Sequence, residues 1–148
     1  MVVENELILN DREFNCDTNT VFVTNPDPAI VTSDGGFVSS LSDGGLSREM
    51  NTNADYFFPV GSSLGTVRYR PVFLEPNFPN GNTFKVRFAN TDATLEGFDR
   101  ELREPNICEV NPEYYHRIYH TSGIDPVDVK LYYDCLLYTS PSPRDLAQ

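Results

Sequence analysis

Apolar residues occur here in short runs that Gly, Pro, Asn and Asp interrupt every few positions, and this punctuation constrains the fold more than any other feature. No segment keeps apolar residues at the 3.6-residue spacing of an amphipathic helix over several turns. Many short strands separated by turn residues are typical of all-β proteins. We therefore predict an all-β fold, and within that class an antiparallel β-sandwich of the immunoglobulin-like type.

The clearest strand is predicted at residues 83–89, where apolar and charged side chains alternate. Strict alternation is typical of a strand with one buried and one solvated face. The buried face should carry Phe84, Val86 and Phe88, and the solvated face Lys85 and Arg87. Residues 127–133 repeat the pattern. Residues 67–74 form a third candidate, but Pro71 lacks an N–H group, which predicts an edge or bulged strand there.

Residues 1–54 are predicted to form a separate N-terminal β-rich segment ahead of a sandwich domain at residues 55–134. The short apolar runs at 7–9 and 21–23 are either the first strands of the sandwich or rungs of a short β-solenoid. No fixed-period repeat decides between these alternatives.

Two connections have a predicted shape. Asp43-Gly44 separates two strand-like runs, and such a dipeptide between strands predicts a β-hairpin. Residues 92–106 are polar and end in Glu-Pro, which favours a long loop with one helical turn at residues 95–102.

The chain is acidic, with 22 Asp and Glu against 11 Lys and Arg, for a net charge of −11. Negative charge repels phosphate backbones and anionic lipid surfaces, so we expect neither nucleic-acid binding nor a polybasic membrane contact. No apolar run approaches the roughly 20 residues that span a bilayer, which argues against membrane insertion.

Cys16 and Cys108 are the two cysteines outside the C-terminal tail. In an exported protein they could form one long-range disulfide, and otherwise they would be two buried thiols. Sequence gives no geometry for the pair, so both alternatives stay open.

The C-terminal residues 135–145 resemble one reading frame of a sequencing adapter, and we exclude residues 135–148 from the fold prediction as a non-native tail. We expect that the native chain was cut near Asp134 and that this chain is a fragment of a longer protein.

Two separated motifs carry a family resemblance. Tyr56-Phe57-Phe58-Pro59-Val60-Gly61-Ser62 and Tyr69-Arg70-Pro71-Val72 form the opening pair, and a closing run extends from Glu113-Tyr114-Tyr115 through Gly123 to residues 127–134. Over residues 55–134 these motifs resemble a β-rich domain of type IX-exported, gliding-associated surface proteins of Bacteroidota. The motif positions, expected to be structural, are Phe58, Pro59, Val60, Gly61, Tyr69, Arg70, Pro71, Tyr114 and Gly123. Tyr115 departs from the pattern, which has tryptophan there.

The resemblance implies a non-catalytic structural or adhesive β-domain of a larger secreted protein at the outer cell surface. Its implied partners are neighbouring domains of the same chain, together with polysaccharide or other cell-surface components. The alternative is a carbohydrate- or calcium-dependent binding module of a secreted multidomain enzyme. The resemblance implies no catalytic residues and no cofactor.

Catalytic and metal-binding patterns are weak in the chain. Gly61 to Gly65 matches G-x-S-x-G around Ser63, but that motif needs a following helix and the next residues favour a strand. His116 and His120 lie four residues apart, which in a strand is about 13 Å and too far for one metal ion. We therefore predict surface histidines and no enzymatic activity.

Three further expectations concern oxygen-rich, aromatic and arginine residues. Asn51, Asn53 and Asp55 offer alternate oxygens, but the glycine of a calcium loop is missing, so a solvated loop is expected with calcium as the alternative.

Arg70 is predicted to bond a carboxylate. The candidate acceptors are Glu75 and Asp99. One cluster of tyrosines could stack on sugar or pack across strands: Tyr114, Tyr115, Tyr119, Tyr132 and Tyr133.

Overall fold

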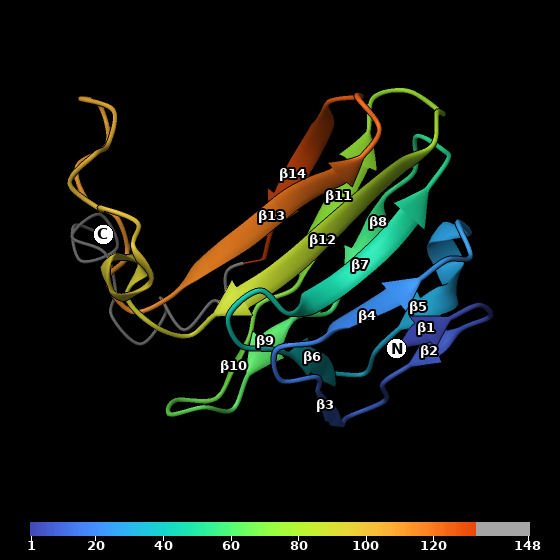
Figure 1. The fold of residues 1–148 in the computed structure, drawn as a ribbon, viewed down its shortest axis with the longest axis horizontal. Coiled ribbons are helices and arrows are strands. Elements are labelled where there is room, and N and C mark those ends of the chain that lie inside the picture. The colour runs from blue at the N-terminus through green and yellow to red at the C-terminus, as the bar shows by residue number, and fades with distance from the viewer. Residues whose placement is uncertain (133–148) are drawn as a thin grey trace, which may run out of the picture.

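The computed structural model describes residues 1–132, and its strands stack in three columns along a common axis (Figure 1). The tail expected at residues 135–148 lies outside the described residues, as do the last two residues of the closing run, Tyr133 and Asp134. Within residues 1–132, regular helix is limited to two short 3-10 turns, η1 (Pro28–Ile30) and η2 (Ala93–Glu96). The prediction of an all-β fold is confirmed.

The first column is a five-stranded sheet. Its strands, in spatial order, are β1 (Val2–Val3), β4 (Thr20–Val23), β7 (Gly45–Met50), β12 (Asn82–Ala89) and β13 (Tyr115–Ser122). The pairs β1–β4 and β4–β7 are parallel, whereas β7–β12 and β12–β13 are antiparallel. The sheet therefore changes from parallel to antiparallel pairing at β7.

The second column lies behind the first (Figure 1). Its strands are β2 (Leu7–Ile8), β5 (Val31–Thr32), β8 (Tyr56–Phe58), β11 (Val72–Pro76) and β14 (Val127–Leu131). The pair β2–β5 is parallel, β5 contacts β8, and β8, β11 and β14 form an antiparallel sheet. The two columns face each other as the layers of a sandwich.

The third column is shorter and closes one side of the molecule. Its strands are β3 (Glu13–Asn15), β6 (Phe37–Ser39), β9 (Gly61–Ser62) and β10 (Arg68–Tyr69). The pair β3–β6 is parallel, a parallel bridge joins Val38 to Val60, and β9–β10 is antiparallel. Each of the first three turns of the chain thus adds one strand to every column. This is the arrangement of β-solenoid rungs, one of the two alternatives for the N-terminal strands.

The predicted hairpin around Asp43-Gly44 is wrong. Its flanking strands β6 and β7 belong to different columns and pair with earlier strands. The turn itself rests on the turn of the preceding rung, where Gly45 N donates to Asn19 O at 3.2 Å. A Cβ on Gly44 would lie 2.6 Å from Asp17 O, so this glycine allows close stacking of two turns rather than a tight reversal.

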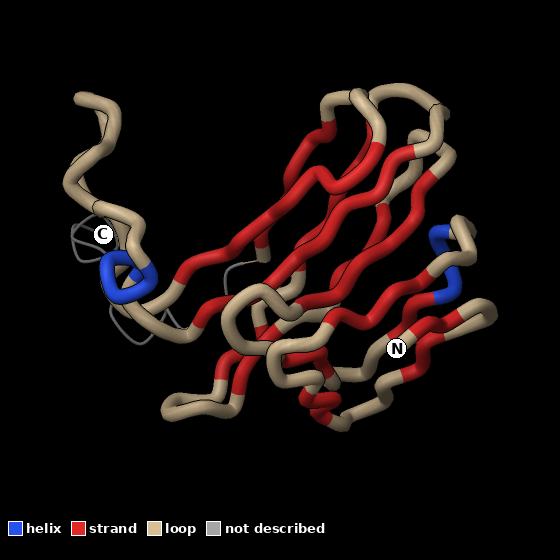
Figure 2. Tube along the Cα trace, viewed as in Figure 1, coloured by secondary structure: helices blue, strands red, loops and turns tan. Residues whose placement is uncertain are grey.

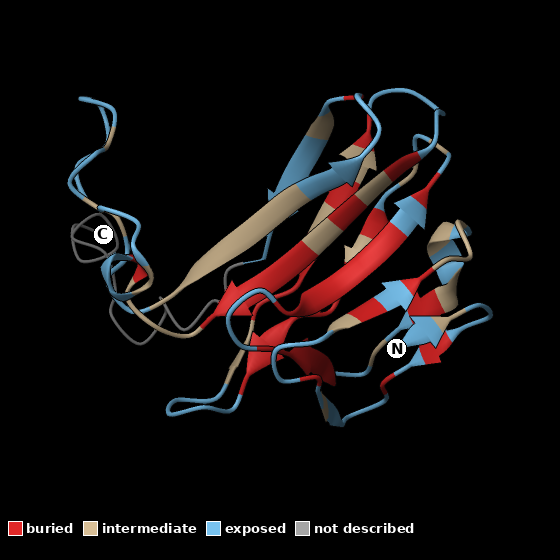
Figure 3. Ribbon diagram, viewed as in Figure 1, coloured by how far each residue is buried: buried red, intermediate tan, exposed pale blue. Residues whose placement is uncertain are grey.

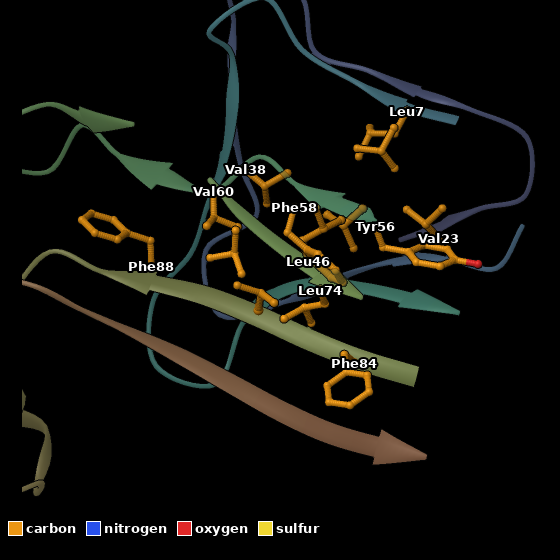
Figure 4. Close-up of a cluster of buried hydrophobic side chains, with 14 of the residues drawn as sticks. Leu7, Val23, Val38, Leu46, Tyr56, Phe58, Val60, Leu74, Phe84 and Phe88 are labelled. Carbon is orange, nitrogen blue, oxygen red and sulfur yellow. The ribbon is translucent and has the colours of Figure 1, made fainter. Parts of the chain in front are cut away.

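One hydrophobic core runs through all three columns (Figures 3 and 4). Leu46 of β7 pairs with Val21 in the parallel part and with Val86 in the antiparallel part, and its side chain is fully buried. The boundary expected at 54/55 falls between β7 and β8, so strands of both predicted segments share a sheet and this core.

Arg48 of β7 is buried inside the rungs. Its guanidinium donates to Phe57 O at 2.8 Å and to Asp27 O at 3.0 Å, and lies 5.1 Å from the centroid of the Tyr56 ring. Burial lowers the pKa of Arg48 to about 10. Main-chain carbonyls, rather than a carboxylate, thus bond this buried charge.

Pro71 falls in the short gap between β10 and β11. The predicted edge or bulged strand is two strands: β10 lies at the edge of its two-stranded sheet with β9, whereas β11 is not an edge strand, because it lies between β14 and β8. The missing N–H of Pro71 is tolerated because the strand starts one residue later. Its carbonyl accepts a hydrogen bond from Tyr132 N at 3.2 Å.

The cysteines do not form a disulfide. Cys16 is a buried free thiol whose Sγ lies 3.2 Å from Ser39 O, and Cys108 is an exposed free thiol. The alternative of two buried thiols is therefore right for Cys16 alone. No helix in residues 1–132 has the length and apolar character needed to cross a bilayer.

Candidate functional site

The long connection from β12 to β13 is mostly loop and includes η2 (Figure 2). Between this connection and β13 lies a cavity of about 410 Å³. Its aromatic and basic lining comes from Phe98, Arg100, Tyr115, Arg117 and Tyr119. A cavity of this size with mainly apolar walls and a few polar groups is typical of small-ligand sites.

An ion pair anchors η2 on the sheet beside the cavity. Arg87 of β12 donates through both terminal nitrogens to the Glu96 carboxylate, at 2.6 and 2.8 Å. Arg87 was expected on a solvated face, and this expectation is wrong because the connection folds over it and buries it. The hydrogen bonds from Arg87 lower the pKa of Glu96 below its ordinary value.

Tyr115 reaches the same carboxylate from β13, with its hydroxyl donating to Glu96. Burial and this bond to an anion raise the pKa of Tyr115 to about 12. Asp92 accepts two hydrogen bonds from Arg100, at 2.7 and 2.9 Å, which closes the start of the connection on itself. These contacts hold the walls of the cavity in place.

A stack of rings and cations follows the outer face of β13. The Arg117 guanidinium lies 5.3 Å from the Phe98 ring centroid and 4.9 Å from that of Tyr119, whose ring also lies 5.1 Å from Lys85 Nζ. Among residues 1–132, Tyr119 Oη and Arg117 Nε are buried atoms that have no hydrogen-bond partner. Both are donors beside the cavity, where a ligand oxygen could satisfy them.

The structure brings together two of the five tyrosines expected to form a stacking face, Tyr115 and Tyr119. Tyr114 points to the other side of the strand, packing at 5.4 Å between ring centroids against Phe88, and Tyr132 follows β14. Tyr133 lies outside the described residues. The sequence analysis did not predict Phe98 as a site residue, because its segment is polar. The ring lines the cavity only because that segment folds onto β13.

The motif residues of the resemblance gather around β8 to β11. Phe58, Pro59 and Val60 are buried, and Pro59 O accepts a hydrogen bond from Val38 N at 2.8 Å. A Cβ on Gly61 would lie 2.8 Å from Cγ of Phe37.

The remaining motif residues also pack in this region or at the far turn. The Tyr69 ring stacks on Phe37 with centroids 6.2 Å apart, and Gly123 has a φ of 96° at the turn after β13. The Arg70 guanidinium is buried 5.5 Å from the Tyr114 ring centroid and donates to Tyr69 O at 2.9 Å.

The two carboxylates expected beside Arg70 bond other groups. Glu75 accepts from Lys130 Nζ at 2.8 Å, and Asp99 accepts from the backbone N–H of Glu101 at 2.9 Å.

The two histidines are packed on the inner face of β13. His116 is half-buried with Nε2 2.9 Å from Arg70 O, and burial lowers its pKa. His120 is exposed, yet its ring stacks on Phe84 at 4.2 Å and contacts Asn82 Oδ1 at 3.1 Å. The prediction of surface histidines is therefore wrong for His116.

The residues considered for calcium binding and for a catalytic serine make other contacts. Asp55 bonds Lys130 Nζ at 2.7 Å. Across residues 1–132, no three His, Cys, Asp or Glu side chains gather in a way that could hold a metal ion. Ser63 donates to the Glu13 carboxylate, and it follows strand β9 in a turn rather than opening a helix.

A scan against protein-family models, a search of the curated proteins and a search of the solved structures found no match to this chain.

Proposed function

We propose that this chain is a rigid, non-catalytic β-module that spaces and displays neighbouring parts of a larger cell-surface protein. The observation that supports it is the continuity of the five-stranded sheet, which passes from parallel rungs into antiparallel strands without a break. A module with one core and one continuous sheet transmits position along its length, because no flexible linker divides it. The motif resemblance supports the extracellular setting.

The experiment places the full chain between a membrane anchor and a fluorescent tag on a display cell, and measures tag height by energy transfer to a membrane dye. We expect one narrow height, because the columns are stiff. A Gly/Ser linker of 148 residues, matched in length, should give a broad distribution. Equal distributions for the two inserts would contradict the spacer function.

A second candidate function is carbohydrate binding, which the cavity beside β13 favours. Sugar rings present apolar faces that stack on aromatic side chains and hydroxyls that pair with donors. Phe98 supplies such a ring, while Tyr119 Oη and Arg117 Nε supply donors that have no partner among residues 1–132.

Affinity electrophoresis of the full chain through gels of neutral polysaccharides, with and without calcium, tests this second function. Binding should retard the chain, and Phe98→Ala should abolish the retardation. Phe78→Ala removes a ring of similar exposure from the turn after β11 and should leave retardation unchanged. Migration unchanged by every polysaccharide would rule the second function out.

A further inference from the structure

Both ends of the stacked columns finish in strand edges that pair with nothing else in residues 1–132. At one end lie β1 and β2, where Val2 is 60% and Ile8 is 56% exposed. At the other end lie β13 and β14, and Figure 3 shows the outer strand β14 largely exposed. Open edges of this kind are templates for pairing with another chain.

The exposed apolar side chains of β14, Val129 and Leu131, face the core side of its sheet. Val129 pairs with Leu74 and Leu131 with Val72, and cross-strand partners share a face. The two partners are fully buried, whereas Val129 remains 45% and Leu131 39% exposed. The core is therefore incompletely covered at this end, as an interface for further strands would be.

Strand directions make the two ends of the first column compatible. The strands β1, β4 and β7 run the same way, β12 reverses, and β13 reverses again. The strand β13 therefore runs in the direction of β1. If a second copy is translated along the column, its β1 can pair in parallel with β13, as β4 pairs with β1 within the chain.

The two ends also differ in charge. The first rung and its turns carry five acidic residues, Glu4, Glu6, Asp11, Glu13 and Asp17, and one arginine, Arg12. Residues 115–131, which form β13, the turn and β14, carry Arg117 and Lys130 against Asp125 and Asp128 and so have no net charge. Head-to-head contact would bring two acidic ends together, whereas head-to-tail contact would not.

We propose that copies of this chain associate head to tail, with β13 and β14 of one copy pairing onto β1 and β2 of the next. The two surfaces differ, so the contact is heterologous and does not close after two copies. Such an arrangement extends the spacer along its own axis, and it rests on the open ends rather than on the spacer function.

Sedimentation velocity of the full chain over a wide concentration range tests the association. The average mass should rise with concentration, and high salt should not weaken the rise, because salt screens the repulsion between acidic chains. Val2→Lys with Ile8→Lys blocks the head, and Val129→Lys with Leu131→Lys blocks the tail, since lysine on an edge opposes pairing. Leu64→Lys, in the loop between β9 and β10, is the matched control and should associate as the parent does.

The decisive measurement mixes the two blocked variants. Each variant alone should remain a single chain. In an equimolar mixture, the free tail of the head-blocked variant can pair with the free head of the tail-blocked variant. The mixture should therefore form a species of two chains and nothing larger. If the tail double variant loses its near-ultraviolet circular dichroism, Val129→Lys alone replaces it. A parent that stays monomeric, association that survives both blocks, or a mixture without dimers would overturn the proposal.

Discussion

The parallel rungs and the antiparallel strands of this molecule each bury an arginine, and different groups bond the two arginines. In the rungs, Arg48 is bonded by main-chain carbonyls of Asp27 and Phe57. In the antiparallel part, Arg87 is bonded by the Glu96 carboxylate, and Asn82 donates to the Asp125 carboxylate at 2.9 Å. Carbonyls cannot be protonated in the ordinary pH range, whereas carboxylates can.

The contacts of the two arginines should therefore respond differently to acid although the two regions share a core. A carboxylate that is hydrogen-bonded in the folded state stabilises it only while ionised. The hydrogen bonds of Arg48 should persist at any moderate pH, because their acceptors are main-chain carbonyls. Four substitutions, from the largest expected effect to the smallest, test whether the two regions unfold together and whether they differ in this way.

Leu46→Ala should have the largest effect, because it removes a fully buried side chain where the two pairing modes meet. We expect a loss of about 3 kcal/mol in the free energy of unfolding, from lost burial and the cavity that remains. Urea unfolding followed by both tyrosine fluorescence and circular dichroism gives the measurement. One shared transition supports coupled regions, while two separated transitions would show that they unfold independently.

Gly61→Ala should come next. Its Cβ would collide with the carbonyl oxygen of Arg68 and would lie 2.8 Å from Cγ of Phe37, where β9 packs against β10 and β6. Overpacking of this kind costs about 2 kcal/mol, visible as a lower thermal midpoint. Gly81→Ala has open space around its Cβ and should melt close to the parent. If the two variants had the same thermal midpoint, close packing at Gly61 would not contribute to the stability of the rungs.

Glu96→Gln sharpens the acid comparison. Loss of the anion beside buried Arg87 should cost about 1.5 kcal/mol at neutral pH. Because the folded pKa of Glu96 is lowered, its contribution is present above the ordinary value of 4.5 and is lost as the pH falls below it.

The measurement is the free energy of unfolding from pH 7 to pH 3 for the parent and the variant. The two curves should converge at the acid end. Glu101→Gln, in the exposed pair with Arg103, is the matched control and should follow the parent throughout. Curves that stay parallel would show that the Glu96 carboxylate does not carry the acid sensitivity.

Lys130→Gln should have the smallest effect. Its amine bridges Asp55 and Glu75 at 2.7 and 2.8 Å, across β14 and its neighbours, and the three groups are exposed to solvent. Salt screens such pairs, so any shift in thermal midpoint should vanish at high salt. A large shift that persists in high salt would indicate that the contact is structural and not merely electrostatic.

The sequence predicted much of the secondary structure and less of the site. The alternation of Phe84, Val86 and Phe88 correctly identified a strand with a buried face. The outer face was predicted wrongly at Arg87, because a distant connection folds over it. Phe98 of the cavity was not predicted either, since nothing local shows that its polar segment packs on β13.

The all-β class follows from local sequence, because turn residues and a two-residue apolar period are local signals. The pairing of the strands does not follow from it and is seen only in the folded chain. The flanks of Asp43-Gly44 could join each other in a hairpin, but each pairs with an earlier strand instead. Pairing depends on contacts between residues far apart in the chain, and a local period specifies faces without specifying partners.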